Sequence, residues 1–395
     1  MLVAVGGISL TACHSGAEQG SAVLRCGPGW TVLPSANPGR TTNEFHAIAA
    51  ISRDNAWAVG SVAYGSGREP EPEGPTDIGM AHPLIEHWDG HGWHVVTGLR
   101  MEGQLAAVAA SSSQDVWAAG TSQRLGPSRL LLLHWNGRRW TTVNPPKLEG
   151  TNVAVASLVA PAGDAAWLAG SQVSPGPYRV LLLRWDGRKW RNERLPRLAG
   201  GNMELSGVGT SSAKDVWAVG WRAISDDRSA PLALHFDGHT WRVVSSPNAG
   251  LLYPSSALRA VAARSPNDAW AVGNQVGAYP GYSLTLTQHW NGRRWSVVRS
   301  PTVGIDTLLT TVGVGAHADV WALGEQVEHG EAETAVLHWN GQDWRFVKAC
   351  NAPEARGTGL SISPDGTVWA SGWIQDGPAH MYHTSTIIQR RLPSH

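Results

Sequence analysis

Three features of this 395-residue sequence predict an all-β fold, a seven-bladed β-propeller of four-stranded antiparallel blades. First, a motif of about fifty residues recurs along the chain, and propeller repeats have this length. Second, no segment carries the sustained apolar spacing of an amphipathic helix. Third, each end of the chain holds part of one further repeat, and the two parts complete each other.

The most regular part of the repeat is a variant of Val-Trp-Ala-x-Gly. Its tryptophan occurs seven times in the sequence, at Trp57, Trp117, Trp167, Trp217, Trp270, Trp321 and Trp369. A second motif, of the form His-Trp-Asn/Asp-Gly-x-x-Trp, follows each of the first six copies. Seven copies of the first motif predict seven blades.

The fifth repeat shows how one blade is expected to form. An apolar strand over Leu258–Ala263 ends at a Ser-Pro-Asn-Asp turn, and a second strand over Asp268–Gly273 ends at glycine. A third strand, Leu284–Trp290, runs into an Asn-Gly pair, whose residues tolerate the positive φ of a hairpin turn. The fourth strand ends at Pro301. Four antiparallel strands in about fifty residues form one blade.

Tryptophan dominates the aromatic content, with 21 Trp against 3 Phe. A single sheet cannot cover both of its faces, whereas blades stacked around an axis cover one another. Each indole ring buries roughly 150–250 Å². We therefore expect the repeated tryptophans to form the core between blades rather than a platform for sugars.

The seventh blade is divided between the two ends of the chain. Gly357–Gly372 and His383–Arg391 supply three of its strands, and Gly29–Gly39 has the form of the fourth strand at Trp241–Gly250. We expect the N-terminal strand to pair with the C-terminal strand and close the ring. Closure would leave no open sheet edge, the usual hazard of β architectures.

Residues 1–12 are typical of a signal peptide, because their apolar run is too short to span a membrane. Leu10–Cys13 resembles the lipobox of bacterial lipoproteins, although no Lys or Arg precedes the apolar run. The resemblance implies cleavage before Cys13 and its acylation. The Ser/Gly/Ala/Gln composition after Cys13 predicts a flexible tether up to residue 25, and the repeats assign residues 26–395 to the propeller. The alternative is an ordinary buried cysteine after a chance apolar stretch.

Cys26 and Cys350 are the other two cysteines. In an exported protein such a pair suggests a disulfide. The repeat alignment argues against it, because it places Cys26 at the turn before a fourth strand and Cys350 after one, at opposite ends of a blade. The sequence leaves both alternatives open.

Charge and histidine pattern exclude several classes of function. The formal net charge is zero and 16% of residues are charged, so the chain lacks the basic footprint of a nucleic-acid-binding protein. One histidine recurs on equivalent strands of five blades, and residues so far apart around a ring cannot converge on one metal ion. These histidines are His87, His134, His235, His289 and His338. We expect them to be structural, and we expect a monomer without metal or cofactor.

Strand order divides the loops between two rims. The first-to-second turns and the Asn/Asp-Gly turns share one short rim, whereas the second-to-third loops and the blade-to-blade links share the other and vary in length. We call the latter the variable rim, and insertions confined to one face usually mark the binding face. We expect His46 and Arg259 to open inner strands there. The candidate binding residues, which depart from the small residues usual at this rim, are His46, Trp221, Asp226, Asp227, Arg259, Glu325 and Trp373.

The combination of Val-Trp-Ala-Val-Gly with His-Trp-Asn-Gly-x-x-Trp resembles a family of exported bacterial repeat proteins, the WD40-, kelch- or sialidase-like propellers. The resemblance covers nearly the whole mature chain and implies architecture rather than activity. Together with the lipobox, it implies a protein anchored by lipid to the outer face of the bacterial cytoplasmic membrane.

Two functions fit these observations. The first is a non-enzymatic propeller that binds a protein or glycan at the cell envelope through its variable rim. The second is a carbohydrate-active hydrolase or lyase that uses rim carboxylates, which would be Asp226, Asp227, Glu325 and Asp376. We favour binding, because no catalytic constellation is visible and a fold alone does not imply an activity.

Overall fold

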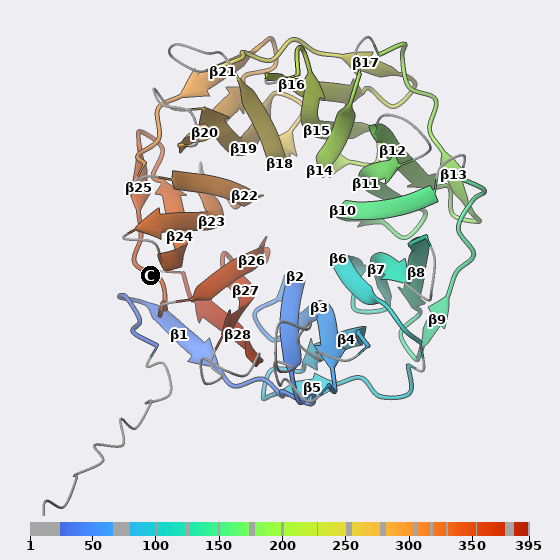
Figure 1. Cartoon of the computed structure of the whole chain (residues 1–395), viewed down its shortest axis with the longest axis vertical. Coiled ribbons are helices and arrows are strands. Elements are labelled where there is room, and N and C mark those ends of the chain that lie inside the picture. The colour runs from blue at the N-terminus through green and yellow to red at the C-terminus, as the bar shows by residue number, and fades with distance from the viewer. Residues whose placement is uncertain are drawn as a thin grey trace, which may run out of the picture.

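The computed structural model describes residues 24–65, 80–99, 101–122, 127–148, 151–173, 178–198, 201–226, 228–249, 255–276, 282–302, 306–316, 319–328, 331–352, 354–375 and 383–393. In this part of the chain the regular secondary structure is entirely β, and it forms seven four-stranded antiparallel sheets arranged as a ring (Figure 1). The predicted seven-bladed propeller is therefore confirmed. The predicted signal peptide and Cys13 lie outside the described residues.

Blades are numbered here from the first complete one, and each runs from its inner to its outer strand. Blade 1 comprises β2 (Thr42–Ser52), β3 (Asn55–Ala63), β4 (His82–Trp88) and β5 (Trp93–Val95). Blade 2 comprises β6 (Gln104–Ser112), β7 (Asp115–Ser122), β8 (Arg129–Trp135) and β9 (Trp140–Thr142). Blade 3 comprises β10 (Thr151–Ala162), β11 (Ala165–Val173), β12 (Tyr178–Trp185) and β13 (Trp190–Asn192).

The remaining blades follow the same order. Blade 4 comprises β14 (Met203–Ser212), β15 (Asp215–Ala223), β16 (Ser229–Phe236) and β17 (Trp241–Val243). Blade 5 comprises β18 (Ser256–Ser265), β19 (Asp268–Val276), β20 (Ser283–Trp290) and β21 (Trp295–Val298). Blade 6 comprises β22 (Asp306–Val314), β23 (Val320–Glu328), β24 (Glu331–Trp339) and β25 (Trp344–Phe346). Blade 7 comprises β26 (Ala355–Ile362), β27 (Val368–Gln375), β28 (Thr384–Arg391) and β1 (Trp30–Leu33).

The two ends of the chain meet in blade 7, as the sequence predicts. β1 pairs antiparallel with β28, and Trp30 lies opposite Arg391 (Figure 1). Trp30 is buried and meets the Trp321 ring of blade 6 edge-on, with ring centroids 5.9 Å apart. The N-terminal strand thus supplies both the last sheet edge and part of the core between blades 6 and 7.

The repeated tryptophans form the core between blades, which confirms their predicted role. The Trp217 ring of blade 4 stacks on His235 of the same blade at 4.2 Å. On its other side it contacts Trp290 and Trp295 of blade 5, at 4.9 and 5.0 Å. Equivalent contacts join blades 1 and 2, 2 and 3, 3 and 4, 5 and 6, and 7 and 1. Each blade is therefore fastened to the next by one aromatic cluster.

Every inner strand contains a β-bulge at the same place, and this corrects one expectation. His46 and Arg259 do not open their strands but are the extra residues of bulges inside β2 and β18. The equivalent residues in the other blades are Ala106, Ala156, Ser206, Thr310 and Thr358. A bulge bends a strand and re-aims a side chain, so the structure creates seven equivalent positions around the centre of the ring.

The bulge also explains the glycine of the repeat. The carbonyl oxygen of Glu204, two residues before the bulge residue of blade 4, approaches Gly220 so closely that a Cβ there would lie 1.9 Å from it. The equivalent carbonyl oxygens, of Glu44 and Arg356, would be 1.8 Å from a Cβ at Gly60 and 1.9 Å from one at Gly372. No side chain fits this approach, so glycine is required by packing.

The Asn/Asp-Gly turns have the predicted geometry, since Gly292 has a φ of +86° and its counterparts are also positive. The outer strands are shorter than expected. β21 ends at Val298 rather than Pro301, because the chain must leave the sheet edge there to reach the centre of the next blade.

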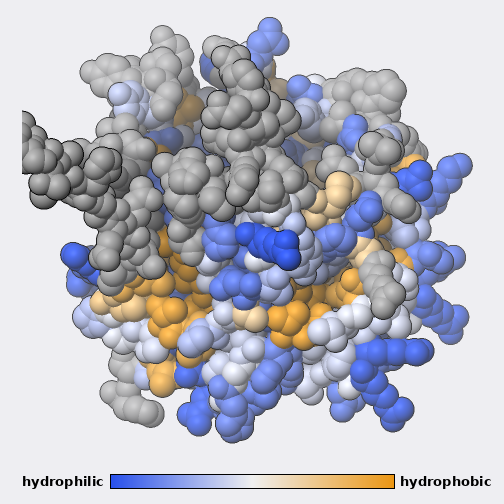
Figure 2. Space-filling view, turned by 60° about the horizontal axis from the view of Figure 1, so that its bottom comes forward, coloured by the Kyte–Doolittle hydropathy of each residue, from blue (hydrophilic) through white to orange (hydrophobic). Residues whose placement is uncertain are grey.

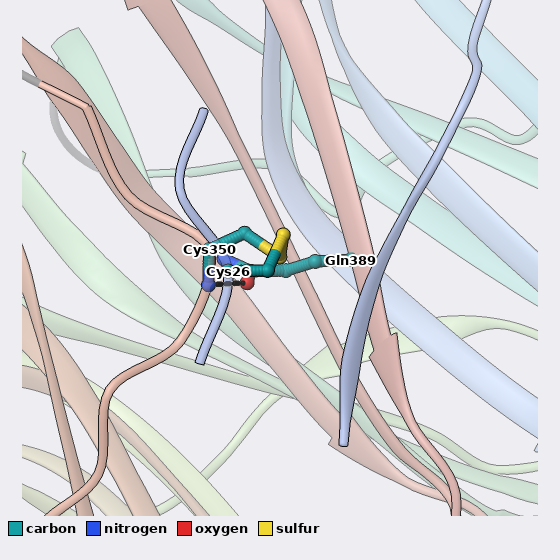
Figure 3. Close-up of a disulfide and its surroundings, with 3 residues drawn as sticks. All are labelled: Cys26, Cys350 and Gln389. Atoms are coloured by element: carbon teal, nitrogen blue, oxygen red, sulfur yellow. Dashed lines mark hydrogen bonds between the residues drawn. A yellow bond between two sulfur atoms is a disulfide. The ribbon is translucent and has the colours of Figure 1, made fainter. Parts of the chain in front are cut away.

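The structure bonds the sulfurs of Cys26 and Cys350 (Figure 3). The alignment that placed them at opposite ends of a blade is wrong, because the strand that pairs with β1 is β28, from the other end of the chain, so that Cys26 does not lie in a hairpin turn. Instead, Arg25 bridges Asn351 antiparallel, and residues 24–27 run beside the link that leaves blade 6. The Cys350 backbone N–H donates to Gln389 Oε1 at 2.7 Å. This contact ties the link to blade 7.

One position of the third strand holds the preceding link in two blades and is taken by a glutamate in a third. Gln389 does so in blade 7, and Gln288 donates to the Pro247 carbonyl at 2.9 Å in blade 5. Glu86 takes this position in blade 1 and is fully buried. Neither of its carboxylate oxygens makes a well-formed hydrogen bond to a described residue. Burial raises the pKa of Glu86 to about 8, although the nearby backbone N–H of Ala36 favours the charged form slightly.

Among the described residues, no helix has the length and apolar character needed to cross a membrane. On the side of the ring that Figure 2 shows, hydrophobic residues form separate patches interrupted by hydrophilic ones.

The approach of Glu204 to Gly220 predicts that Gly220→Ala destabilises the protein by about 3 kcal/mol, because a backbone oxygen cannot move aside as a side chain would. Gly201→Ala is the matched control, since a Cβ at Gly201 would meet nothing within 4 Å. Urea unfolding of both variants measures the difference. Equal stability of the two variants would contradict the packing explanation.

The environment of Glu86 predicts that Glu86→Gln increases the stability of the fold by an amount that depends on pH. The pKa in the folded state is raised above the unfolded value, so the wild type loses stability as pH rises from about 4.5 to about 8. Glutamine does not titrate, and the variant should therefore be more stable at pH 8 by on the order of a few kcal/mol. The difference should shrink toward pH 4.5. Urea unfolding across this range tests the prediction, and a gain that is the same at every pH would reject it.

Candidate functional site

The variable rim is held together by hydrogen bonds between neighbouring blades. The backbone N–H at the start of a third strand donates to a side chain at the start of the next blade's inner strand. Examples are Tyr178 to Asn202 Oδ1 at 2.9 Å and Ser229 to Ser255 Oγ at 3.0 Å. These contacts fix the loops of one blade against the next. Residues 66–79, between β3 and β4, lie outside the described residues.

The half of the central channel nearer the short rim has a described lining without charged side chains. A cavity of about 470 Å³ is lined by all seven inner strands, on the side of the bulges nearer the short rim. Its described lining consists of small and aliphatic residues such as Ala109, Gly209 and Val312, with serines and threonines but no charged side chain. General acid–base catalysis needs a positioned titratable group, which this lining does not offer.

A pocket of about 340 Å³ lies between blades 4 and 5 at the variable rim. Three predicted binding residues meet in it: Trp221, Asp226 and Arg259. Trp221 follows the repeat glycine in β15, Asp226 stands in the loop from β15 to β16, and Arg259 is the bulge residue of β18. We call this cavity the blade 4–5 pocket.

Further polar residues line the blade 4–5 pocket, among them Asn274 of β19 and Arg228 of the β15–β16 loop. Arg259 Nε and Asn274 Oδ1 are buried and have no hydrogen-bond partner among the described residues. Asp226 is the one carboxylate in the described lining. The predicted Asp227 lies outside the described residues, so its place relative to this pocket stays a prediction.

A second group of predicted residues meets between blades 6 and 7. Glu325 forms an ion pair with Arg356, whose guanidinium carbon lies 5.5 Å from the ring centre of Trp373. Arg356 also lies 3.8 Å from a carboxylate oxygen of Glu354. Sequence reasoning missed Arg356, although its place two residues before the bulge could have indicated it. Glu325 is therefore neutralised by a partner and is remote in the chain and in the ring from Asp226.

His46 has a structural role in this arrangement. Its Nδ1 lies 2.8 Å from the Leu105 carbonyl of blade 2, and its Nε2 lies 3.5 Å from Glu44 Oε2. The side chain thus ties the bulge of blade 1 to the next inner strand. It does not join the blade 4–5 pocket.

The repeated histidines are structural, as predicted. Each stacks on the tryptophan of its own blade, and four of them place Nε2 against an aspartate of the first-to-second turn. These pairs are His134–Asp115 at 2.6 Å, His235–Asp215 at 2.7 Å, His289–Asp268 at 3.0 Å and His338–Asp319 at 2.6 Å. Within the described ranges, no group of three His, Cys, Asp or Glu side chains could hold a metal ion.

Blade 3 shows that this pair is a packing unit. Ala165 replaces the aspartate and Arg184 replaces the histidine, and the Arg184 guanidinium lies 4.9 Å from the ring centre of Trp167. The cation takes over the stacking on tryptophan once the carboxylate is gone. Both partners change together, as expected when they act on each other rather than on a ligand.

An outer groove between blades 3 and 4, of about 530 Å³, was not foreseen. Its acidic residue, Glu193, accepts a hydrogen bond from Trp241 Nε1 at 3.1 Å. Burial raises the pKa of Glu193, and this hydrogen bond opposes the rise. The carboxylate is engaged in the packing between the two blades.

No known family model matches the sequence, and no curated protein matches it either. Solved structures share its fold. YCF48 bound to D1 peptide has a TM-score of 0.55 and 15% identity, covering 96% of this chain and 100% of that one. The GH74 xyloglucanase from Xanthomonas campestris has a TM-score of 0.52 and 17% identity, covering 90% of this chain and 55% of that one. Likeness at these identities supports the propeller fold alone, so the resemblance to exported lipoproteins stays a prediction.

Proposed function

We propose that this protein is a membrane-tethered, non-enzymatic propeller that binds a protein or glycan at the cell envelope through its variable rim. The observation that carries the proposal is the blade 4–5 pocket. It brings Trp221, Asp226 and Arg259 together on strands and a loop of two blades that are clamped to each other. An aromatic ring beside both signs of charge is a combination typical of recognition surfaces.

The described geometry favours binding over hydrolysis. A glycoside hydrolase needs two carboxyl groups about 5–10 Å apart. The described lining of the blade 4–5 pocket contains one, Asp226, while Glu325 pairs with Arg356 in another part of the rim. Asp376, the last of the carboxylates considered, lies outside the described residues.

The two structural neighbours support a recognition role only in general terms. One is described as bound to a peptide and the other as a xyloglucanase, so a protein or glycan partner accords with the fold. The proposed localisation rests on the lipobox-like Leu10–Cys13 and on the tether that follows it. An acyl anchor on Cys13 would hold the ring near the membrane surface.

Site-specific photocrosslinking tests the binding face. A photoreactive amino acid at Ser225, beside the blade 4–5 pocket, should form an adduct in intact cells. The same amino acid at Arg293, in the Asn-Gly turn of the short rim, should form none and is the matched control. Adducts from Arg293 alone would reject the assignment of the face. Cleavage of a polysaccharide that is lost in Asp226→Asn would favour the hydrolase instead.

Membrane attachment is tested by Cys13→Ser. The variant lacks the thiol that would be acylated, so we expect it in the soluble fraction, with the wild type in the membrane fraction. Metabolic labelling with a fatty acid should mark the wild type only. Continued attachment of the variant to membranes would contradict the anchor.

A further inference from the structure

Arg259 is a half-buried cation whose buried Nε has no hydrogen-bond partner among the described residues. It is held by the bulge of β18 and lines the blade 4–5 pocket. No described residue accepts from its buried Nε–H, and no described carboxylate forms an ion pair with it. Buried donors are nearly always satisfied in native proteins, because an unmade hydrogen bond costs free energy. Within the described part of the chain, Arg259 therefore has donor capacity left for a further acceptor.

The other polar side chains at the bulge position differ from Arg259. His46 bonds the Leu105 carbonyl, and Thr358 donates to the Phe45 carbonyl. Ser206 donates to Glu204, and Thr310 donates to the Leu323 carbonyl. Each of these four groups has a partner within the ring. Arg259 is thus the exception among the polar members of an equivalent set.

Three other arginines have a carboxylate or an aromatic ring beside the guanidinium group. Arg264, five residues further along β18, lies 3.2 Å from Asp268, and Arg356 pairs with Glu325. Arg390 lies 5.3 Å from the ring centre of Trp369. The fold supplies an anion or an aromatic face to these three cations. It supplies neither to Arg259 among the described residues.

The walls of the blade 4–5 pocket indicate the shape of the missing partner. A guanidinium matches a carboxylate, because its parallel N–H groups can donate to both oxygens. Asn274 adds an amide whose buried Oδ1 is unpaired, and Trp221 adds an aromatic wall. A cavity of about 340 Å³ has room for one acidic side chain with its adjoining backbone.

The tyrosines of the chain favour a polypeptide as the source of the carboxylate. Three described tyrosines flank second-to-third loops: Tyr64 after β3, Tyr178 at the start of β12 and Tyr282 before β20. The described ones are exposed, with 51% for Tyr64, 46% for Tyr178 and 42% for Tyr282. Tyrosine on loops at one end of a rigid β scaffold, beside serine, glycine and asparagine, is typical of surfaces that bind proteins.

We propose that the blade 4–5 pocket binds an acidic side chain of a partner polypeptide, with Arg259 donating to its carboxylate. The Asn274 amide bonds the peptide backbone beside it, and Trp221 packs against the same residue. This inference deepens the proposed function and rests on it. In this arrangement Arg259 makes the pocket select an acidic residue at one position of the partner.

Two pools of peptides test the proposal. Their termini are blocked and their flanking residues are random, and the central residue is Glu in one pool and Gln in the other. The full-length protein in detergent should retain the Glu pool about tenfold or more over the Gln pool, because the charge pair is partly desolvated. Arg259→Gln should abolish this preference, and Arg259→Lys should keep part of it. Arg293→Gln, on the short rim, should leave it unchanged. Melting temperatures of all variants establish that each is folded.

Equal retention of the two pools by the wild type, or a preference that survives in Arg259→Gln, would overturn the proposal. The wild type could instead retain an oligogalacturonate through Arg259 and show no preference between the peptide pools. That result would overturn the choice of a polypeptide as the partner. Photocrosslinking from Ser225 distinguishes failure of this inference from failure of the proposed binding function. If an adduct forms but the Glu preference is missing, only the inference fails, whereas absence of the rim adduct removes the binding role on which it rests.

Discussion

The packing of each blade's tryptophan against one or two aromatic rings of the next blade is the contact on which the structure depends. Trp217, for example, is covered on one face by His235 and elsewhere by Trp290 and Trp295 of blade 5. A single blade would leave such a ring, with roughly 150–250 Å² of surface, in water. Neighbouring blades must therefore fold against one another, and the series must close. Trp30 completes this closure by covering Trp321 from the other end of the chain.

The same packing determines at which positions the blades can carry different residues. The glycine of the repeat admits the carbonyl that precedes the bulge, and the bulge turns one residue per blade toward the centre of the ring. Two of these seven residues are alanines, and four of the five polar ones are used to bond the ring internally. The fifth, Arg259, has no hydrogen-bond partner for its Nε among the described residues. The blade 4–5 pocket is thus a place where a symmetric framework carries an unsymmetric group, as expected of a binding site grafted on a repeat.

Substitutions inside the framework behave differently from those at the rim. In blade 3 the Asp–His pair is replaced by Ala165 and Arg184, and the tryptophan keeps a stacked partner. In blade 1 a glutamate stands where other blades have leucine or glutamine, and its carboxyl group is buried at a cost that appears as a raised pKa. Such changes alter how a blade is packed, whereas Trp221, Asp226 and Arg259 alter what the rim can contact.

The sequence by itself determined the number of blades, their four strands, the role of the tryptophans and the closure by Trp30, because these follow from a repeated local pattern and from the need to cover each sheet. It also identified residues of the variable rim, since they depart from the repeat. Only the tertiary structure decided that Trp221, Asp226 and Arg259 share one pocket, that Glu325 is paired with Arg356, and that Cys26 reaches Cys350. These outcomes depend on bulges and on contacts between segments far apart in the chain. A repeat alignment cannot supply them, because it treats every blade alike and fixes no side-chain direction.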